Sequence, residues 1–242
     1  MTRFLASVRD ASEVRLALAA GADVVDLKDP AAGALGALAP DAIARCIAAV
    51  GGRAEVSATV GDLPMEPEIV RAAVAAAAAT GVDYVKLGLF PGGDPDACLD
   101  RLAGMIPTVR LILVLFADAA PPFDALPKAA AIGATGVVLD TALKDGRSLL
   151  DHMPVARIAA FVAEARARGL LAGLAGALKA PDVPKLLKLT PDLIGFRGAL
   201  CRNGARGARL DAEACAAIRA LIPQEKRPAA EPRMSRLAPS LC

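Results

Sequence analysis

Two hydrophobic patterns alternate along the chain. Short runs rich in valine, leucine and isoleucine are each followed by a longer segment with helical spacing. This alternation predicts a parallel sheet whose strands are connected by helices. We expect strands at Phe4–Val8, Val24–Lys28, Glu55–Val60, Tyr84–Leu87, Leu111–Phe116, Gly136–Asp140, Leu170–Ala175 and Leu193–Arg197. We expect helices near Ala11–Ala20, Asp41–Val50, Glu66–Thr80, Pro95–Ile106, Phe123–Ala131, Val155–Arg168, Pro181–Leu189 and Asp211–Leu221.

Eight strands alternating with eight helices predict an α/β fold, a single (β/α)8 TIM barrel, and the 242 residues suit it. The junctions AAGADVVDL, ATGVDYVKL and AIGATGVVLD share one order: a helix, a glycine in a left-handed turn, a short linker and a strand. We place the barrel domain at residues 1–222. From residue 223 to 242 the chain is rich in proline and charge, which predicts a flexible, disordered tail. Packing of this tail on a neighbouring subunit is the alternative.

Strand parity sorts the side chains into two faces. In the second strand Val25 and Leu27 share one face, while Asp26 and Lys28 share the other. The third and fourth strands divide in the same way, with polar faces at Glu55, Ser57, Thr59, Tyr84 and Lys86. The apolar faces should pack against the helices. The polar faces should line the lumen near its carboxyl-terminal rim, where barrel enzymes keep their chemistry.

Composition narrows the class of protein. Hydrophobic residues make up 55% of the chain, which allows a large core, and the net charge of +2 is too small to indicate a nucleic-acid or membrane partner. No apolar run is long enough for a membrane span or a secretory signal. Five scattered cysteines without a C-x-x-C pair indicate a reducing, cytoplasmic location and no zinc site. The single histidine, His152, lies in SLLDHMP, which we interpret as a surface loop leading to a helix.

Three lysines follow predicted strands: Lys28 in VVDLKDP, Lys86 in DYVKLGLF and Lys144 in LDTALKDG. Asp26 and Asp140 lie close to two of them in sequence. A free lysine has a pKa of about 10.4, and burial beside other ammonium groups can lower it to ~7–8. This set therefore suits Schiff-base chemistry on a carbonyl, with aspartates moving protons. The alternative is structural, with ion pairs between Asp26 and Lys28 and between Asp140 and Lys144.

The last two predicted strands are followed by glycine-rich loops, GLAGAL and GFRGALC. Barrel enzymes often bind phosphate at these loops through backbone amides, so Gly173, Gly176, Arg197 and Gly198 are candidate phosphate ligands. Ser57 and Thr59 in SATVGDLP are candidates for orienting a polyol substrate. In the same segment Asp62 would hold a lysine or cap the next helix, with the cap favoured. A basic stretch with Arg202, Arg206 and Arg209 either extends the anion site or forms a solvated loop, which we favour.

The strings DVVDLKDPAAGALGA, SATVGD, DYVKLGL, LDTALKDG, LAGAL and GFRGALC resemble the (5-formylfuran-3-yl)methyl phosphate synthases, also called 4-(hydroxymethyl)-2-furancarboxaldehyde-phosphate synthases. The resemblance runs in order from about Phe4 to about Ile222. It implies a (β/α)8 barrel that condenses two molecules of glyceraldehyde 3-phosphate into a phosphorylated furan aldehyde, with loss of phosphate and water. The product would feed methanofuran-type one-carbon carriers, and the reaction would need no metal or cofactor.

The same resemblance implies roles for individual residues. Lys28 matches the Schiff-base lysine, and Asp26 matches its neighbouring acid/base. Lys86 and Lys144 match the other essential lysines, and Asp140 matches the aspartate of the sixth strand. Which aspartate removes the α-proton, Asp26 or Asp140, stays open.

Two other functions compete with this one. A class I aldolase-like lyase acting on another sugar phosphate would share the lysine chemistry. A non-catalytic barrel would bind a phosphorylated metabolite without turnover. We expect a small-molecule partner, a triose phosphate, and a homo-oligomer of undetermined size built through alanine-rich helix faces.

Overall fold

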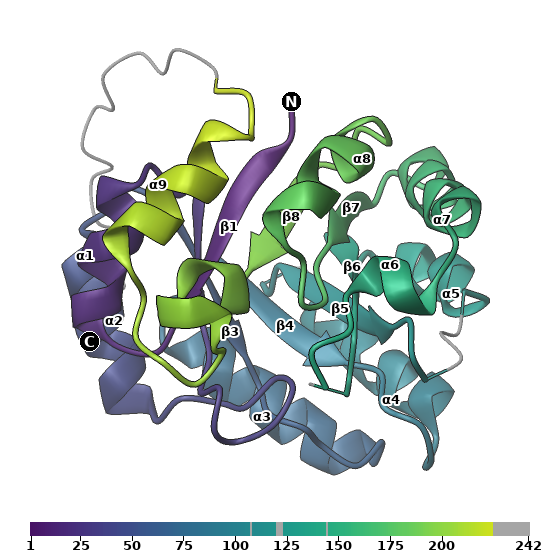
Figure 1. The fold of residues 1–242 in the computed structure, drawn as a ribbon. Helices are drawn as coiled ribbons and strands as arrows, with labels where there is room; N and C mark the ends of the chain where they lie inside the picture. The colour runs from purple at the N-terminus through teal and green to yellow at the C-terminus, as the bar shows by residue number, and fades with distance from the viewer. Residues whose placement is uncertain (107, 120–122, 144, 225–242) are drawn as a thin grey trace.

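The structure is a computed structural model that describes residues 1–106, 108–119, 123–143 and 145–224. It is a closed barrel of parallel strands in sequence order, with the last strand paired to the first (Figure 1). The strands are β1 (Arg3–Val8), β2 (Val24–Leu27), β3 (Glu55–Thr59), β4 (Tyr84–Gly88), β5 (Leu111–Phe116), β6 (Gly136–Asp140), β7 (Leu171–Leu174) and β8 (Leu193–Phe196). The predicted fold class is confirmed, and each strand bound differs from the expected one by one residue at most.

Helices surround the ring of strands (Figure 1). They are α1 (Ala11–Ala19), α2 (Pro40–Val50), α3 (Pro67–Ala79), α4 (Pro95–Leu102), α5 (Ala125–Ala131), α6 (Leu149–His152), α7 (Val155–Ala167), α8 (Val183–Leu187) and α9 (Ala212–Ala220). Short 3-10 turns add η1 (Ala103–Met105), η2 (Ala180–Asp182), η3 (Gly198–Leu200) and η4 (Arg202–Gly204).

Two helix predictions need correction. The helix expected to reach Ile106 ends at Leu102 and continues as η1, where Gly104 is a poor helix former. The segment around His152 is not a loop but the short helix α6. Ser148 and Asp151 form a capping box there, which satisfies backbone amides at its first turn.

The junctions between helices and strands use the predicted glycine and a second, unpredicted device. Gly21 has a φ of 80°, so the left-handed turn is confirmed there, as it is in the other two junctions. The second feature is an aspartate just before a strand. Its carboxylate accepts a hydrogen bond from a backbone amide of the preceding strand. Asp23 accepts from the Phe4 amide at 2.9 Å, and Asp192 accepts from the Ala172 amide at 2.8 Å. These bonds fix the register at the amino-terminal end of the barrel.

Strand parity places an apolar layer against the helices as predicted, and it also places an apolar layer in the lumen, which was not predicted. The larger layer lies between strands and helices and includes Val25, Leu27, Val56 and Ala58. The smaller layer fills the lumen, with Leu5, Val24, Tyr84, Ile112, Val114, Phe116, Val138 and Leu193 among its members. The lumen is therefore packed and apolar at its base, which leaves the carboxyl-terminal rim for polar groups.

Charged groups close the amino-terminal end of the lumen. Glu55 at the start of β3 pairs with Arg3 and with Arg110, and it accepts a hydrogen bond from the Tyr84 hydroxyl at 3.0 Å. The Arg110 guanidinium also stacks 3.9 Å from the centre of the Tyr84 ring. Residues at this end of a barrel serve stability, and the chemistry is expected at the opposite end.

Most of the predicted tail, residues 225–242, lies outside the described residues. Among the helices that the structure describes, none has the length and apolar character needed to cross a membrane.

Gly173 in β7 gives a test of the lumen packing. An added Cβ there would lie 2.8 Å from side-chain atoms of both Val138 and Leu193. We expect Gly173→Ala to lower the free energy of unfolding by about 1–3 kcal/mol, because the lumen has little room for another methyl group. The matched control is Gly104→Ala in η1, where no described atom lies within 4 Å of the added Cβ. It should stay within about 0.5 kcal/mol of the parent in urea unfolding. Equal stabilities for the two variants would contradict the packing described here.

Candidate active site

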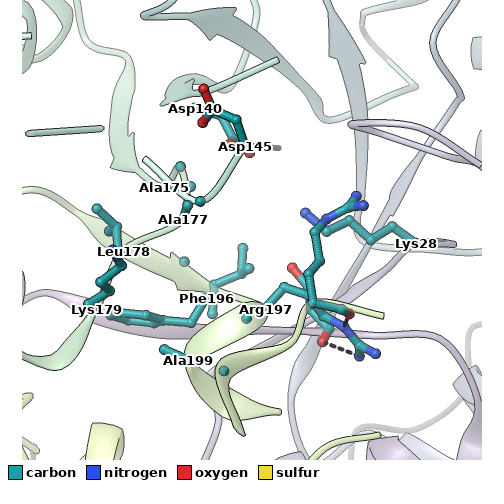
Figure 2. Close-up of a pocket in the computed structure, with 18 of the residues that line it drawn as sticks. Lys28, Asp140, Asp145, Ala175, Ala177, Leu178, Lys179, Phe196, Arg197 and Ala199 are labelled. Atoms are coloured by element: carbon teal, nitrogen blue, oxygen red, sulfur yellow. Dashed lines mark hydrogen bonds between the residues drawn. The ribbon is translucent and has the colours of Figure 1, made fainter. Parts of the chain in front are cut away.

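A cavity of about 590 Å³ opens at the carboxyl-terminal ends of the strands. Its walls come from the ends of β1, β2, β4 and β6 and from the loops after β7 and β8, and they include Ser7, Lys28, Lys86, Asp140, Gly176 and Arg206. Figure 2 shows Lys28 and Asp140 on different walls, with Leu178 and Lys179 from the loop after β7 on another. Of the polar faces predicted from strand parity, Lys28 and Lys86 therefore meet at this cavity.

Asp26 lies behind the cavity wall and is completely buried. Its carboxylate accepts hydrogen bonds from the Ser7 hydroxyl at 2.9 Å and from the Ser57 hydroxyl at 2.6 Å. The Lys86 Nζ lies 3.0 Å from Asp26 Oδ1. The ion pair recorded for Asp26 is thus with the lysine of β4, whereas the structural alternative named Lys28.

The environment of Asp26 fixes its charge. Burial alone would raise the pKa of this carboxyl, but the positive charges of Lys86 and Lys28 and the Ser57 hydrogen bond outweigh it, and the pKa lies below its usual value. A carboxyl with a lowered folded-state pKa stabilises the fold above its unfolded pKa. That contribution is lost as the pH falls through the folded value. Asp26 is therefore an anion at neutral pH.

Lys28 directly follows β2 and is only 6% exposed. Its backbone amide donates to the Val8 carbonyl at 3.0 Å, which extends the pairing of β1 and β2 beyond the strand end. Its side chain enters the cavity (Figure 2). The position agrees with the predicted placement of a lysine at the rim.

The loop after Lys28 is held by side chains from β3 and the loop that follows it. The Thr59 hydroxyl donates to the Gly36 carbonyl at 2.9 Å. The Asp62 carboxylate accepts from the amides of Ala34 and Leu35, both at 2.7 Å. Asp62 therefore clamps a backbone loop, and the predicted helix cap or lysine contact is wrong.

On the opposite wall Asp140 ends β6 and lines the cavity. Its Oδ1 accepts from the Thr141 amide at 2.7 Å. The following loop is clamped by Asp118, whose two oxygens accept from the amides of Ala142 at 2.8 Å and Leu143 at 2.7 Å. Lys144, the third predicted lysine, lies outside the described residues.

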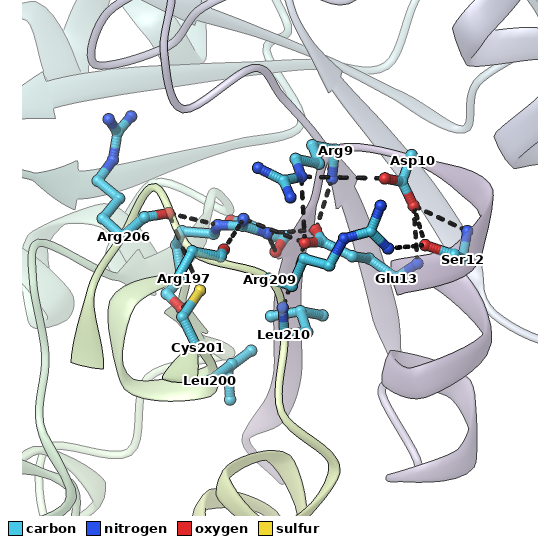
Figure 3. Close-up of polar contacts among 12 residues, drawn as sticks. Arg9, Asp10, Ser12, Glu13, Arg197, Leu200, Cys201, Arg206, Arg209 and Leu210 are labelled. Atoms are coloured by element: carbon cyan, nitrogen blue, oxygen red, sulfur yellow. Dashed lines mark hydrogen bonds and ion pairs between the residues drawn. The ribbon is translucent and has the colours of Figure 1, made fainter. Parts of the chain in front are cut away.

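Arg197 does not have the arrangement expected of a phosphate ligand. All five of its N–H groups donate to protein acceptors: Nε to the Arg206 carbonyl, Nη1 to Ser7 O and Glu13, and Nη2 to Glu13 and Ala208 O. Arg197 and Glu13 are both buried, and Figure 3 shows their contacts with the loop after β8. Arg197 does line the cavity, but these contacts use its N–H groups, so in this structure its side chain holds the loop.

Three other residues predicted to bind substrate instead contact other parts of the protein. Ser57 holds Asp26, Thr59 holds the loop after β2, and Gly173 lies within β7 against lumen side chains. None of the three is among the cavity-lining residues that the structure describes. Gly176 and Gly198 do line the cavity, so the prediction stays open for the backbone of the loops after β7 and β8.

The three arginines of the predicted basic stretch lie in different surroundings. Arg206 lines the cavity, whereas Arg202 is exposed and Arg209 reaches away to donate to the Ser12 hydroxyl at 3.2 Å. The solvated-loop interpretation thus holds for Arg202 and is wrong for Arg206.

Two contributors escaped the sequence analysis although a signal existed. Strand parity applied to RFLASV would have placed Ser7 on the lumen face with Leu5. Asp118, two residues after β5, stands at a strand end as Asp62 does after β3. Arg206 was named in the basic stretch, but nothing in the sequence distinguished it from Arg202 and Arg209, because a loop arginine is placed only by the fold.

His152 and the cysteines take no part in this cavity as far as the structure describes it. Cys46, Cys98, Cys201 and Cys215 are buried and unpaired. Within the described ranges, no group of three or more histidine, cysteine, aspartate or glutamate side chains is placed to hold a metal ion.

Comparison with known proteins gives one consistent family. The family model described as 4-HFC-P synthase matches residues 4–219. A protein of Methylorubrum extorquens, named "Putative (5-formylfuran-3-yl)methyl phosphate synthase", is 46% identical and the match covers 90% of this chain and 92% of that protein. The (5-formylfuran-3-yl)methyl phosphate synthase of Archaeoglobus fulgidus is 35% identical, with 87% of this chain and 95% of the relative covered. That of Methanococcus maripaludis strain C7 is 34% identical, with coverages of 84% and 91%.

Solved structures with low sequence identity share the fold. Phosphoribosyl anthranilate isomerase from Thermus thermophilus matches with a TM-score of 0.65 at 20% identity, covering 91% of this chain and 98% of that one. A 3-hexulose-6-phosphate synthase matches with a TM-score of 0.62 at 18% identity, with coverages of 92% and 100%. These likenesses support the barrel architecture alone.

The pair of Asp26 and Lys86 can be tested by removing its charges in turn. We expect Asp26→Asn to lower the free energy of unfolding by about 3–5 kcal/mol, because the Lys86 ammonium is left buried without its counter-ion. Lys86→Met should cost a similar amount. The double variant should cost less than the sum of the single variants in denaturant unfolding. Strictly additive losses would show that the two charges do not interact.

A second pair of variants tests the structural role of Arg197. We expect Arg197→Gln to lower the free energy of unfolding by about 3–5 kcal/mol, because the buried Glu13 carboxylate loses its partner. The control is Arg168→Gln on the surface of the barrel, whose pair with Glu164 at 3.0 Å is exposed. It should change stability by about 0.5 kcal/mol or less. Similar losses at the two sites, measured by thermal and urea unfolding, would refute the assignment.

Proposed function

The chain belongs to the 4-HFC-P synthase family, and from this premise we propose that it makes (5-formylfuran-3-yl)methyl phosphate for the biosynthesis of methanofuran-type cofactors. The substrate in this proposal is glyceraldehyde 3-phosphate, two molecules of which condense with loss of phosphate and water. The observation that carries it is the convergence of Lys28, Lys86 and Asp140 on one cavity at the catalytic end of a barrel.

The first step is an imine at Lys28. Its amine attacks the aldehyde carbon of one triose phosphate, and water leaves as the iminium forms. Lys28 suits this step because it directly follows β2 and its side chain lines the cavity. Lys86 itself is paired with Asp26, so it serves as a fixed cation.

Asp140 then removes the proton next to the iminium carbon, which gives an enamine. We assign this role to Asp140 because it faces the cavity, whereas Asp26 is buried behind the wall with Ser7, Ser57 and Lys86 as partners. The enamine carbon attacks the aldehyde of the second triose phosphate. The Lys86 ammonium stabilises the alkoxide that forms, and eliminations of phosphate and water complete the ring. Water then hydrolyses the iminium, which releases the product aldehyde and returns the free Lys28 amine.

The loops after β7 and β8 suit the binding of a substrate phosphate. Gly176 and Gly198 bring backbone without side chains to the cavity, and Ala177 beside them has a φ of 46°. An alanine in the left-handed region is strained, and strain of this kind is common at ligand sites. We therefore assign the phosphate contacts to the backbone of these loops, a common arrangement in barrels.

The proposal predicts a furan product from a single substrate. Purified protein incubated with glyceraldehyde 3-phosphate alone should give a product with furan absorbance and the mass of the furan phosphate. Borohydride added during turnover should label Lys28, as located by peptide mass mapping. Lys28→Arg keeps the charge but forms no productive imine, so it should lower the rate by at least about 1,000-fold.

The control for this experiment is Lys188→Arg, at an exposed lysine that follows α8, and it should retain the parental rate. Label on another lysine would overturn the assignment of Lys28. An aldol product without furan absorbance would instead support the aldolase-like alternative, and tight binding without turnover would support the non-catalytic one.

A further inference from the structure

Arg206 crosses from one loop of the barrel rim to another. It lies in the loop between η4 and α9, yet its guanidinium donates to the carbonyls of Pro30, Gly33 and Ala34, which belong to the loop after β2. The residues are more than 170 positions apart in sequence. This loop begins at Lys28, so Arg206 is fixed close to the proposed imine lysine.

The Arg197 side chain holds the main chain around Arg206. The Arg197 Nε donates to the Arg206 carbonyl at 3.0 Å, and Arg197 Nη2 donates to the Ala208 carbonyl at 2.8 Å. Figure 3 shows the Arg206 side chain directed away from the cluster of Arg197 and Glu13. The arginine of the last strand therefore places the backbone from which Arg206 extends to the cavity.

The guanidinium of Arg206 keeps donors for a ligand. Its hydrogen bonds to described residues use Nη1 once and Nη2 twice. An arginine has five N–H groups, so the Nε–H and one Nη1–H remain. Arg206 and Lys28 line the same cavity, and burial lowers the pKa of Arg206, with Asp140 the foremost charge acting against that shift.

We propose that Arg206 is a specificity-determining residue, which binds the phosphate group of the triose phosphate held as an imine at Lys28. The proposal rests on the proposed function and adds a side-chain contact to the backbone contacts assigned to Gly176 and Gly198. A guanidinium N–H forms a strong, charge-assisted hydrogen bond to a phosphate oxygen, and the Nε–H and the remaining Nη1–H of Arg206 can each form one. The three carbonyl contacts hold the guanidinium in place before the substrate arrives.

The test compares a phosphorylated with a non-phosphorylated aldehyde. The concentrations of glyceraldehyde 3-phosphate and of glyceraldehyde that give half-maximal borohydride labelling are measured for the parent protein and for Arg206→Gln. We expect Arg206→Gln to raise the value for glyceraldehyde 3-phosphate roughly 10- to 100-fold, from the loss of a charged hydrogen bond. The value for glyceraldehyde should change by less than about twofold, because it has no phosphate to bind.

Two further variants accompany this measurement. Arg202→Gln, in η4 just before this loop, is exposed and does not line the cavity, so it should match the parent with both aldehydes. Arg206→Lys keeps the charge but not the guanidinium, so it should weaken the response to the phosphorylated aldehyde alone, and it replaces Arg206→Gln if that variant does not fold. An equal loss with both aldehydes would assign Arg206 to loop positioning only and would overturn the proposal, as would no loss at all.

Failure of the proposed function has a different signature. If the parent protein gives no borohydride adduct with either aldehyde, the imine mechanism is wrong. The role of Arg206 is then decided by titrating inorganic phosphate in a calorimeter. Phosphate binding that is roughly tenfold or more weaker in Arg206→Gln than in Arg202→Gln supports the anion site, and equal binding refutes it.

Discussion

The site depends on one buried negative charge. Asp26 has no exposed surface, and a carboxylate in that position is tolerated only with hydrogen bonds and an opposite charge. Ser7, Ser57 and Lys86 supply them, and together the four residues join β1, β2, β3 and β4. The Lys86 ammonium is thereby fixed in the cavity. These four strands are polar at this level of the lumen for this reason, while Leu5, Val24 and Tyr84 from the same strands belong to its apolar layer.

Above this layer, carboxylates hold the rim loops through backbone amides, and guanidiniums hold them through backbone carbonyls. Asp62 and Asp118 each bind two successive backbone amides, and they hold the loops that follow β2 and β6. Arg197 and Arg206 bind backbone carbonyls, and they hold the loops that follow β8 and β2. Since carboxylates only accept and guanidiniums only donate, each loop is held through whichever backbone groups its neighbours leave unpaired.

Strand and helix positions follow from local patterns, and so the barrel and the lumen face of Asp26, Lys86 and Ser57 were within reach of the sequence. Partners were not. The residue that pairs with Asp26 is set by the register of β2 against β3 and β4, not by nearness in sequence, which favoured Lys28. Arg197 resembled a phosphate ligand because the buried Glu13 that occupies it lies 184 positions away. A donor's availability depends on tertiary contacts that a motif does not contain.

Local charge also explains how a nearly neutral chain can bind anions. The net charge of +2 says little, because many surface charges occur as exposed pairs such as Arg45 with Asp41. In the described cavity wall, the cationic residues outnumber the two carboxylates, Asp140 and Asp145: they are Lys28, Lys86, Lys179, Arg197 and Arg206. Low-dielectric walls concentrate that excess toward the opening, so an anionic substrate is drawn to the cavity rather than to the protein at large. The cations of the rim thus serve for attraction and binding, while the uncharged amine needed for an imine is required at one lysine only.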